Sequence, residues 1–143
     1  MTSDMTTGDT VEGGCMCGAL RYRVTGPIEG VAHCHCTMCR RWSGAVAVTW
    51  FTVPLSRFDL HKGEFATYES SEHGRRHYCP KCATQLAFWS SRRAEEIDIT
   101  LGTIDHPEAH PASYHVYTSS RLPWLRLDDH LPTYKSQSSG SAS

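Results

Sequence analysis

Seven cysteines in three tight groups constrain this chain more than any other feature of its sequence. The groups have the spacings C-x-C, C-x-C-x-x-C and C-x-x-C, and they consist in order of Cys15 and Cys17; Cys34, Cys36 and Cys39; and Cys79 and Cys82. Clustered thiols in a reducing compartment indicate metal binding or catalysis, because disulfides do not persist there. A complete set of intramolecular disulfides would also leave one thiol over, so a disulfide scaffold is the weaker alternative.

The reducing compartment is itself an expectation from the sequence. The opening stretch MTSDMTTGDT lacks the basic and apolar regions of a signal peptide. No apolar run approaches the ~20 residues that cross a bilayer. We therefore expect a cytoplasmic protein without a membrane partner. With 14 basic and 15 acidic residues, the formal net charge of -1 gives no basic surface for nucleic acid. The sequence leaves the oligomeric state open.

A length of 143 residues is sufficient for one domain with one hydrophobic core. We expect a flexible N-terminus over residues 1–12 and a zinc-binding domain over residues 13–134. Residues 135–143 end in SQSSGSAS, a Ser/Gly-rich composition that predicts a disordered tail.

Between these ends the hydrophobic period is two, which predicts short β-strands. The alternation is clearest in two segments, whose apolar faces consist of Leu20, Tyr22 and Val24 and of Ile97, Ile99 and Leu101. Residues 45–53 and 85–89 are apolar runs of strand type, and pairs containing Gly or Pro separate the segments. Only residues 37–44 are expected to form a short helical turn, and residues 90–96 a loop. The predicted fold class is mainly β.

The arithmetic of the cysteine groups predicts two different metal sites. Sulfur-rich tetrahedral sites select zinc or iron–sulfur clusters, and zinc is the commoner occupant. The two outer pairs together offer four thiolates, which would close a structural site. The central group offers three, and three ligands with an open position are typical of a catalytic site. Because the outer pairs are more than sixty residues apart, a shared metal would cross-link distant parts of the domain.

Four histidines near the cysteines are candidates for further ligands or substrate contacts. If residues 33–36 are extended, the two cysteines face one way while His33 and His35 face the other, which keeps these histidines off the same metal. The favoured interpretation is that they lie at the surface or contact the ligands from outside. For His73 and His77, in the predicted turn before the last cysteine pair, we favour solvent-exposed loop positions over a ligand role.

Several segments resemble the glutathione-dependent formaldehyde-activating enzymes, a family with the Mss4-like (β-tent) zinc fold. The matching segments are GGCMCGALRY, CHCTMCRRWSGA, YCPKCATQLAF, IDITLGTID and SSRLPWLRLDDHLPTY. Together they extend over about residues 13–134, and the length of the chain resembles that of short bacterial relatives. The resemblance implies a fold of short antiparallel strands held together by zinc.

The resemblance implies two zinc ions per chain. The implied ligands are Cys15, Cys17, Cys79 and Cys82 for a structural zinc, and Cys34, Cys36 and Cys39 for a catalytic zinc. One departure is Ala83, where the family usually has glycine after the second C-x-x-C. Because alanine lacks the freedom of glycine at positive φ, we expect the local turn to differ and the zinc site to remain.

The implied activity is that of a carbon–sulfur lyase, S-(hydroxymethyl)glutathione synthase-like, which handles adducts of a thiol with a small aldehyde. Glutathione and formaldehyde are the implied substrates. A thiol that enters an open zinc position is deprotonated near neutral pH. Arg40 and Arg41, directly after Cys39, are the candidates for binding the carboxylates of glutathione, since arginine binds carboxylates bidentately. Surface ion pairs are their alternative role. Arg75 and Arg76 are expected in a solvated turn.

Two other functions are alternatives for a chain with these cysteine groups. A non-catalytic zinc module that binds a partner would gain little from an unfilled coordination position. A methionine sulfoxide reductase of the B type would use two C-x-x-C pairs, and of the outer groups only Cys79 and Cys82 have that spacing.

Overall fold

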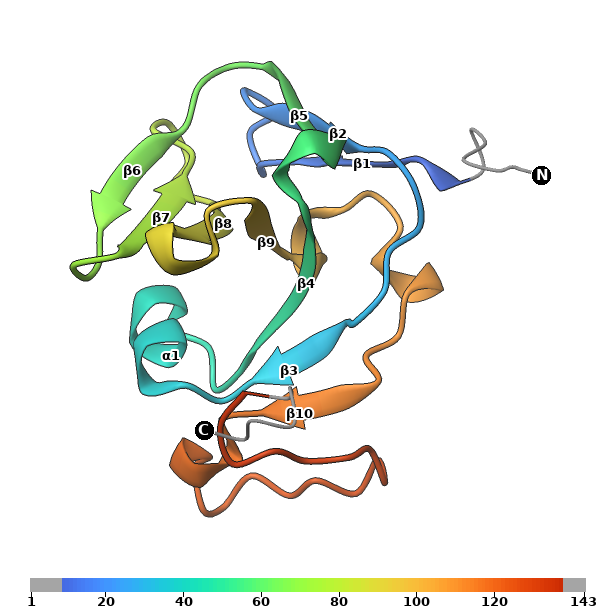
Figure 1. Cartoon of the computed structure of the whole chain (residues 1–143), viewed down its shortest axis with the longest axis vertical. Coiled ribbons are helices and arrows are strands. Elements are labelled where there is room, and N and C mark those ends of the chain that lie inside the picture. Colours follow the sequence, from blue (N-terminus) through green and yellow to red (C-terminus); the bar gives the residue numbers. More distant parts are fainter. Residues whose placement is uncertain (1–8, 138–143) are drawn as a thin grey trace.

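The structure is a computed structural model that describes residues 9–137, and its strands form two sheets. The strands and the helix are, in chain order, β1 Val11–Gly14, β2 Arg21–Val24, β3 Ala32–Cys34, α1 Thr37–Ser43, β4 Val48–Pro54, β5 Phe58–Lys62, β6 Ala66–Glu69, β7 Gly74–Tyr78, β8 Gln85–Ser90, β9 Glu96–Thr100 and β10 Tyr114–Val116 (Figure 1). Single turns of 3-10 helix lie between the strands at η2 Leu55–Arg57, η3 Ser91–Arg93, η4 Leu101–Thr103 and η5 Pro107–Ala109, and one follows β10 at η6 Thr118–Ser120.

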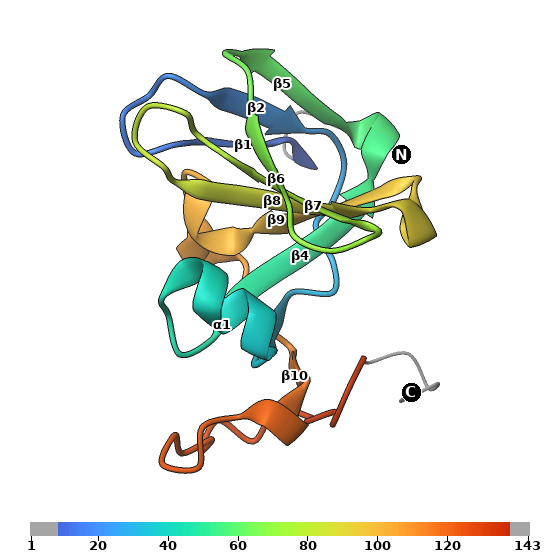
Figure 2. The same ribbon diagram turned by 90° about the vertical axis from the view of Figure 1, so that its left-hand side faces the viewer.

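The two sheets are mostly antiparallel. The small sheet has the strand order β1-β2-β5, and the large sheet has the order β10-β3-β4-β9-β8-β7-β6. Among the strands of the described residues only β10 and β3 pair in parallel, and His115 of β10 also forms an isolated parallel bridge with Thr133. Figure 2 shows the small sheet above β7, β8 and β9 of the large sheet. The expected class, a mainly β Mss4-like fold of short antiparallel strands, is confirmed.

The main hydrophobic core joins the two sheets. Leu20, Tyr22 and Val24, the face predicted from alternation in β2, are each at most 1% exposed. They belong to one buried cluster with residues of β4, β8 and β9, namely Phe51, Val53, Leu86, Ala87, Ile97 and Ile99. Burying such side chains stabilises a fold by about 1.5–3 kcal/mol each. Cys15 and Cys79 lie in this same cluster, so one cysteine of each outer pair is buried in the main core.

A second, smaller core lies under α1. Its buried members are Cys34, Cys39, Val48 and Trp50. The helix covers it with Trp42, which stacks on Trp50 with ring centroids 6.1 Å apart and an interplanar angle of 10°. As predicted, α1 is short: it ends at Gly44, whose φ of 75° is the left-handed conformation that glycine adopts without strain.

The ends of the domain are more ordered than the sequence predicts. β1 begins at Val11 and pairs with β2, inside the segment 1–12 that was expected to be flexible. At the other end, the backbone N–H of Tyr117 donates to the carbonyl of Ser136 at 2.9 Å, inside the expected tail. The rest of these two expectations concerns residues 1–8 and 138–143, which lie outside the described residues.

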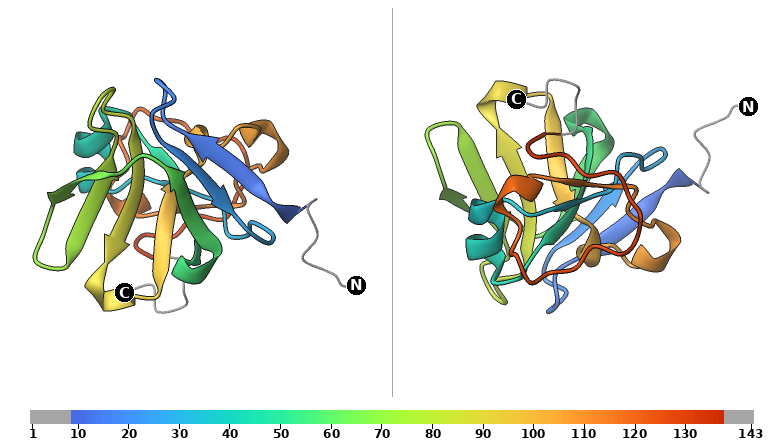
Figure 3. Two further views of the ribbon diagram at one scale, coloured as in Figure 1. Left: turned by 90° about the horizontal axis from the view of Figure 1, so that it is seen from above. Right: turned by 90° about the horizontal axis from the view of Figure 1, so that it is seen from below.

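The C-terminal part of the chain runs along β10 at one end of the large sheet. Seen from below (Figure 3, right), this segment passes in front of the strands, whereas α1 lies toward the β6 and β7 side in both views. None of the helices in residues 9–137 is long and apolar enough to cross a membrane.

Candidate metal centres

The outer cysteine pairs converge on one point. The four sulfur atoms of Cys15, Cys17, Cys79 and Cys82 all lie within 4.8 Å of one another. The Sγ atoms of Cys15 and Cys17 are 3.6 Å apart, and those of Cys17 and Cys79 are 3.9 Å apart. A tetrahedral zinc with Zn–S bonds of about 2.3 Å separates its sulfur ligands by about 3.8 Å. The donor set and its spacing therefore fit a four-thiolate zinc site.

Backbone turns direct these sulfurs inward. The backbone N–H of Leu20 donates to Sγ of Cys15 at 3.2 Å, and that of Lys81 donates to Sγ of Cys79 at 3.3 Å. Such hydrogen bonds favour thiolates over thiols. Ala83 has a φ of 67°, so alanine adopts the left-handed conformation itself. The turn therefore has a backbone conformation that glycine adopts freely, here with the strain of a Cβ at positive φ.

The thiols of the outer cluster differ in acidity. The hydrogen bond with the backbone of Ala19 favours ionisation of Cys17, but burial and the three neighbouring thiols outweigh it and raise the pKa of Cys17 to about 11. The pKa of Cys82 is lowered to about 5, first by the hydroxyl of Thr84 and then by the backbone N–H of the same residue. For Cys15, burial opposes ionisation, but the Leu20 N–H and the neighbouring thiols bring its pKa below the ordinary value.

The central group forms a second cluster with three sulfurs. Cys34 ends β3, Cys36 is the N-cap of α1, and Cys39 lies in the first turn of that helix. Their Sγ atoms also lie within 4.8 Å of one another, and those of Cys34 and Cys39 are 3.7 Å apart. This spacing again fits the edge of a zinc tetrahedron, with three corners filled by the protein. The seven cysteines are all free thiols, so no disulfide competes with either cluster.

The three central thiols differ in acidity. Hydrogen bonds from Cys34 and Cys39, helped by backbone N–H groups of α1, lower the pKa of Cys36 to about 2. The same contact with Cys36, together with Cys39 and burial, raises the pKa of Cys34. Within this cluster the hydrogen bonds therefore favour ionisation of Cys36 over that of Cys34.

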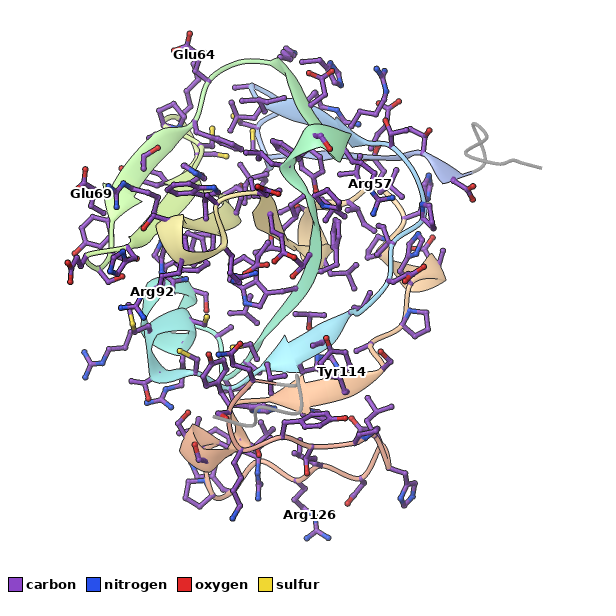
Figure 4. The ribbon with its side chains drawn as sticks, in the orientation of Figure 1. Arg57, Glu64, Glu69, Arg92, Tyr114 and Arg126 are labelled. Atoms are coloured by element: carbon purple, nitrogen blue, oxygen red, sulfur yellow. The ribbon has the colours of Figure 1, made fainter. Side chains whose placement is uncertain are left out.

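A cavity of about 660 Å³ opens onto the central cluster. All three cysteines line it, together with aromatic and aliphatic side chains of β4, β8 and β10 and with Arg76, Arg92 and Arg93. Arg93 is engaged by carboxylates, since it contacts Glu96 and Asp98 at 2.8 Å each. Arg92 makes no ion pair within the described residues, and in the view of Figure 4 it lies between η3 and α1.

Arg40 and Arg41, the residues expected to bind substrate, do not line this cavity in the described part of the chain. Arg40 donates to the carbonyl oxygen of Ser120 at 3.3 Å. Sequence reasoning did not place Arg92 at the cavity; it follows β8 in the expected loop 90–96. Only the sheet order, which brings the β8–β9 connection to the cavity, identifies it.

No histidine of the described residues belongs to either sulfur cluster, and for His33 and His35 this agrees with the prediction from the extended geometry of residues 33–36. His33 and His35 both pack on His115, with ring centroids 4.9 and 5.2 Å away. His35 is 1% exposed, so the expectation of a surface position is wrong for it. His77 lies in β7 rather than in a turn and stacks on Phe65 at 4.8 Å.

His115 links this histidine group to the C-terminal segment. Its Nδ1 is 3.0 Å from Nε2 of His35, and its Nε2 is 2.8 Å from the carboxylate of Asp129. Asp129 lies within the matching segment SSRLPWLRLDDHLPTY, in the part of the chain that runs beside β10. The chain Asp129–His115–His35 therefore holds this segment against the backbone of the central cysteines.

Comparisons with known proteins assign the chain to a family. The family model described as "Glutathione-dependent formaldehyde-activating enzyme" matches residues 10–120. A "Putative glutathione-dependent formaldehyde-activating enzyme" of Halomonas elongata is 26% identical over 130 residues, 82% of this chain and 81% of that protein. The crystal structure of a Rhodobacter sphaeroides protein is similar with a TM-score of 0.55 and 18% identity, over 85% of this chain and 98% of that one. This last similarity shows the fold. Since the family model matches most of its length, the chain belongs to the glutathione-dependent formaldehyde-activating enzyme family.

Proposed function

We propose that the protein is a cytoplasmic, zinc-dependent enzyme of carbon–sulfur lyase type, which handles adducts of glutathione with formaldehyde or a similar small aldehyde. The observation that carries the proposal is that three sulfurs converge on one wall of a cavity of about 660 Å³. A zinc held by three protein ligands would retain an open coordination position, and all three cysteines line the cavity. The name of the family and that of the Halomonas elongata relative support this substrate pair. Thiolate ligands need a reducing compartment, which supports the cytoplasm.

The number of sulfurs in each cluster supports one catalytic and one structural zinc site. Zinc bound by thiolates supplies a site at which an incoming thiol ionises near neutral pH. Cys34, Cys36 and Cys39 would hold it in this role, and Cys15, Cys17, Cys79 and Cys82 would hold a second ion that is structural. The outer cluster has four sulfurs and offers no open position.

The cavity also has a group suited to the carboxylates of glutathione. Arg92 is exposed, lines the cavity and has no carboxylate partner within residues 9–137. A guanidinium in that state is available to bind a carboxylate bidentately. The aromatic side chains of Trp50 and Phe88 form the apolar part of the wall.

Titration calorimetry tests the proposal directly. The zinc-loaded protein is expected to release or take up heat when titrated with glutathione, and Cys36→Ser is expected to show none, because serine does not provide a thiolate to the site. S-Methylglutathione is the chemical control, since it has the carboxylates but no free thiol. Adduct formation with formaldehyde is followed by NMR. Equal heats for wild type and Cys36→Ser would reject the site assignment and leave a non-catalytic zinc module.

Single arginine variants identify the carboxylate contact. We expect Arg92→Ala to weaken glutathione binding by about 1–2 kcal/mol with the zinc content unchanged, because a charge-assisted hydrogen bond is lost at a partly solvated position. Arg40→Ala and Arg41→Ala are the matched comparisons on α1. If either weakens binding while Arg92→Ala does not, the assignment made from the sequence is right and that of Arg92 is wrong.

A further inference from the structure

Arg76 is a buried cation without an acidic partner. It lies in β7 and is 4% exposed. No carboxylate of the described residues forms an ion pair with it, although the chain has ten such contacts elsewhere in residues 9–137. Its neighbour Arg75 projects from the same strand and approaches Glu69 on β6 at 3.8 Å. Glu69 is labelled at the outer edge of the sheet in Figure 4.

The guanidinium of Arg76 is held in one orientation by two aromatic rings. Its central carbon lies 5.0 Å from the ring centroid of Trp42 and 4.8 Å from that of Phe88, its cross-strand partner on β8. Both terminal nitrogens are 3.9 Å from Sγ of Cys39. The fork of the guanidinium therefore faces one of the three central sulfurs.

Aromatic rings alone do not neutralise a buried charge. A cation withdrawn from water is strongly unfavourable unless an anion is near, and the π faces of the two rings offset only part of that cost. Zinc bound by three thiolates has a formal charge of about -1, which matches one guanidinium in magnitude. Cys39, whose sulfur Arg76 contacts, belongs to that group.

We propose that Arg76 is the counter-ion of the metal-loaded central cysteines and that its charge raises the affinity of this site for zinc. The inference rests on the proposed zinc at Cys34, Cys36 and Cys39 and adds a positioning residue outside the ligand set. Arg76 acts through the sulfur of Cys39 and does not contact the metal.

Three variants separate charge from packing. Arg76→Met keeps an apolar side chain between the two rings without the charge, Arg76→Lys keeps the charge, and Arg75→Met is the control on the same strand. The measurement is zinc affinity by competition with a chromophoric chelator. The phase of the competition curve that belongs to the central cysteines is the one that is missing in Cys39→Ser. We expect Arg76→Met to weaken zinc binding about 10–100-fold, the usual effect of removing a partner of a metal ligand. Arg76→Lys is expected to lose less, and Arg75→Met nothing.

Thermal melting in the Cys39→Ser background, with zinc removed from the central site, provides the second reading. There Arg76 has lost its counter-ion, so adding Arg76→Met is expected to leave the melting temperature unchanged or raise it. If Arg76→Met alone does not fold, this comparison still distinguishes a counter-ion role of Arg76 from a packing role. A lower melting temperature for the double variant, or equal zinc affinity in wild type and Arg76→Met, would make Arg76 a packing residue and overturn the inference. A wild type that binds no zinc at the central site would instead overturn the proposed function.

Discussion

Replacing Cys79 with serine is expected to lower the free energy of unfolding by several kcal/mol, a large share of the ~5–15 kcal/mol of a typical domain. Cys79 is fully buried in the core that joins the two sheets, and its sulfur is part of the four-thiolate cluster. A metal site that does not exist in the unfolded chain contributes its binding energy to folding. Loss of one ligand therefore weakens zinc binding and the domain together.

The position of the outer cluster in the chain makes this effect large. Cys17 and Cys79 are 62 residues apart, so a shared metal closes a long loop. By the loop-closure relation used for disulfides, a cross-link over ~60 residues stabilises a fold by about 4 kcal/mol, against about 2 kcal/mol for a loop of about six residues. A metal bound there would hold the turn after β1 against the turn between β7 and β8.

Zinc content and thermal melting measure the effect. Cys79→Ser is expected to melt far below the wild type or to be insoluble, and removal of zinc from the wild type with a strong chelator is expected to give the same state. Ala87→Ser is the control, because it adds a hydroxyl to the same core without touching a metal ligand. If Cys79→Ser lowers the melting temperature no further than Ala87→Ser does, the outer cluster does not stabilise the fold through a metal.

Local patterns predicted the parts of the fold whose burial alternates. β2 and β9 were found from one apolar face, and α1 from the short run that ends at Gly44. β7 was missed because its sequence, GRRHY, is polar and was interpreted as a solvated turn. The expectation for Arg76 was wrong for this reason: its charge is buried against aromatic rings contributed by α1 and β8. These rings come from distant parts of the chain, so only the tertiary structure shows that they contact the charge of Arg76.

The candidate site likewise has a part that the sequence predicted and a part that it did not. Spacing within each group predicted that the cysteines form two clusters, and the structure places their sulfurs together in those sets. The cavity could not be predicted, because its wall combines β3, α1, β4, β7, β8 and η3, and no local pattern gives their order in the sheet. Arg92 depends on that order, whereas the choice of Arg40 and Arg41 depended only on their closeness to Cys39 in sequence.

Cys39→Ser is expected to have the opposite balance of effects from Cys79→Ser: full loss of activity with little loss of stability. Its sulfur closes a loop of only about six residues with Cys34, and its cluster belongs to the smaller core, which has four buried members. The substitution removes one of three ligands, which leaves too few thiolates to hold a zinc at an open site. The main core and the outer cluster are unchanged, so they keep the domain folded.

Zinc analysis, melting and the adduct assay, run on the same preparation, decide between the two clusters. We expect Cys39→Ser to retain one zinc per chain and a cooperative melt close to that of the wild type, while adduct formation falls to the uncatalysed rate. Met38→Leu is a matched control in the same turn of α1, since Met38 lines the cavity without offering a strong ligand. The two clusters differ in loop length and in the core that surrounds them. Cys79→Ser is therefore expected to lose mainly stability, and Cys39→Ser mainly activity. An unfolded Cys39→Ser beside a stable Cys79→Ser would make the central cluster the structural one and reject the open-site mechanism.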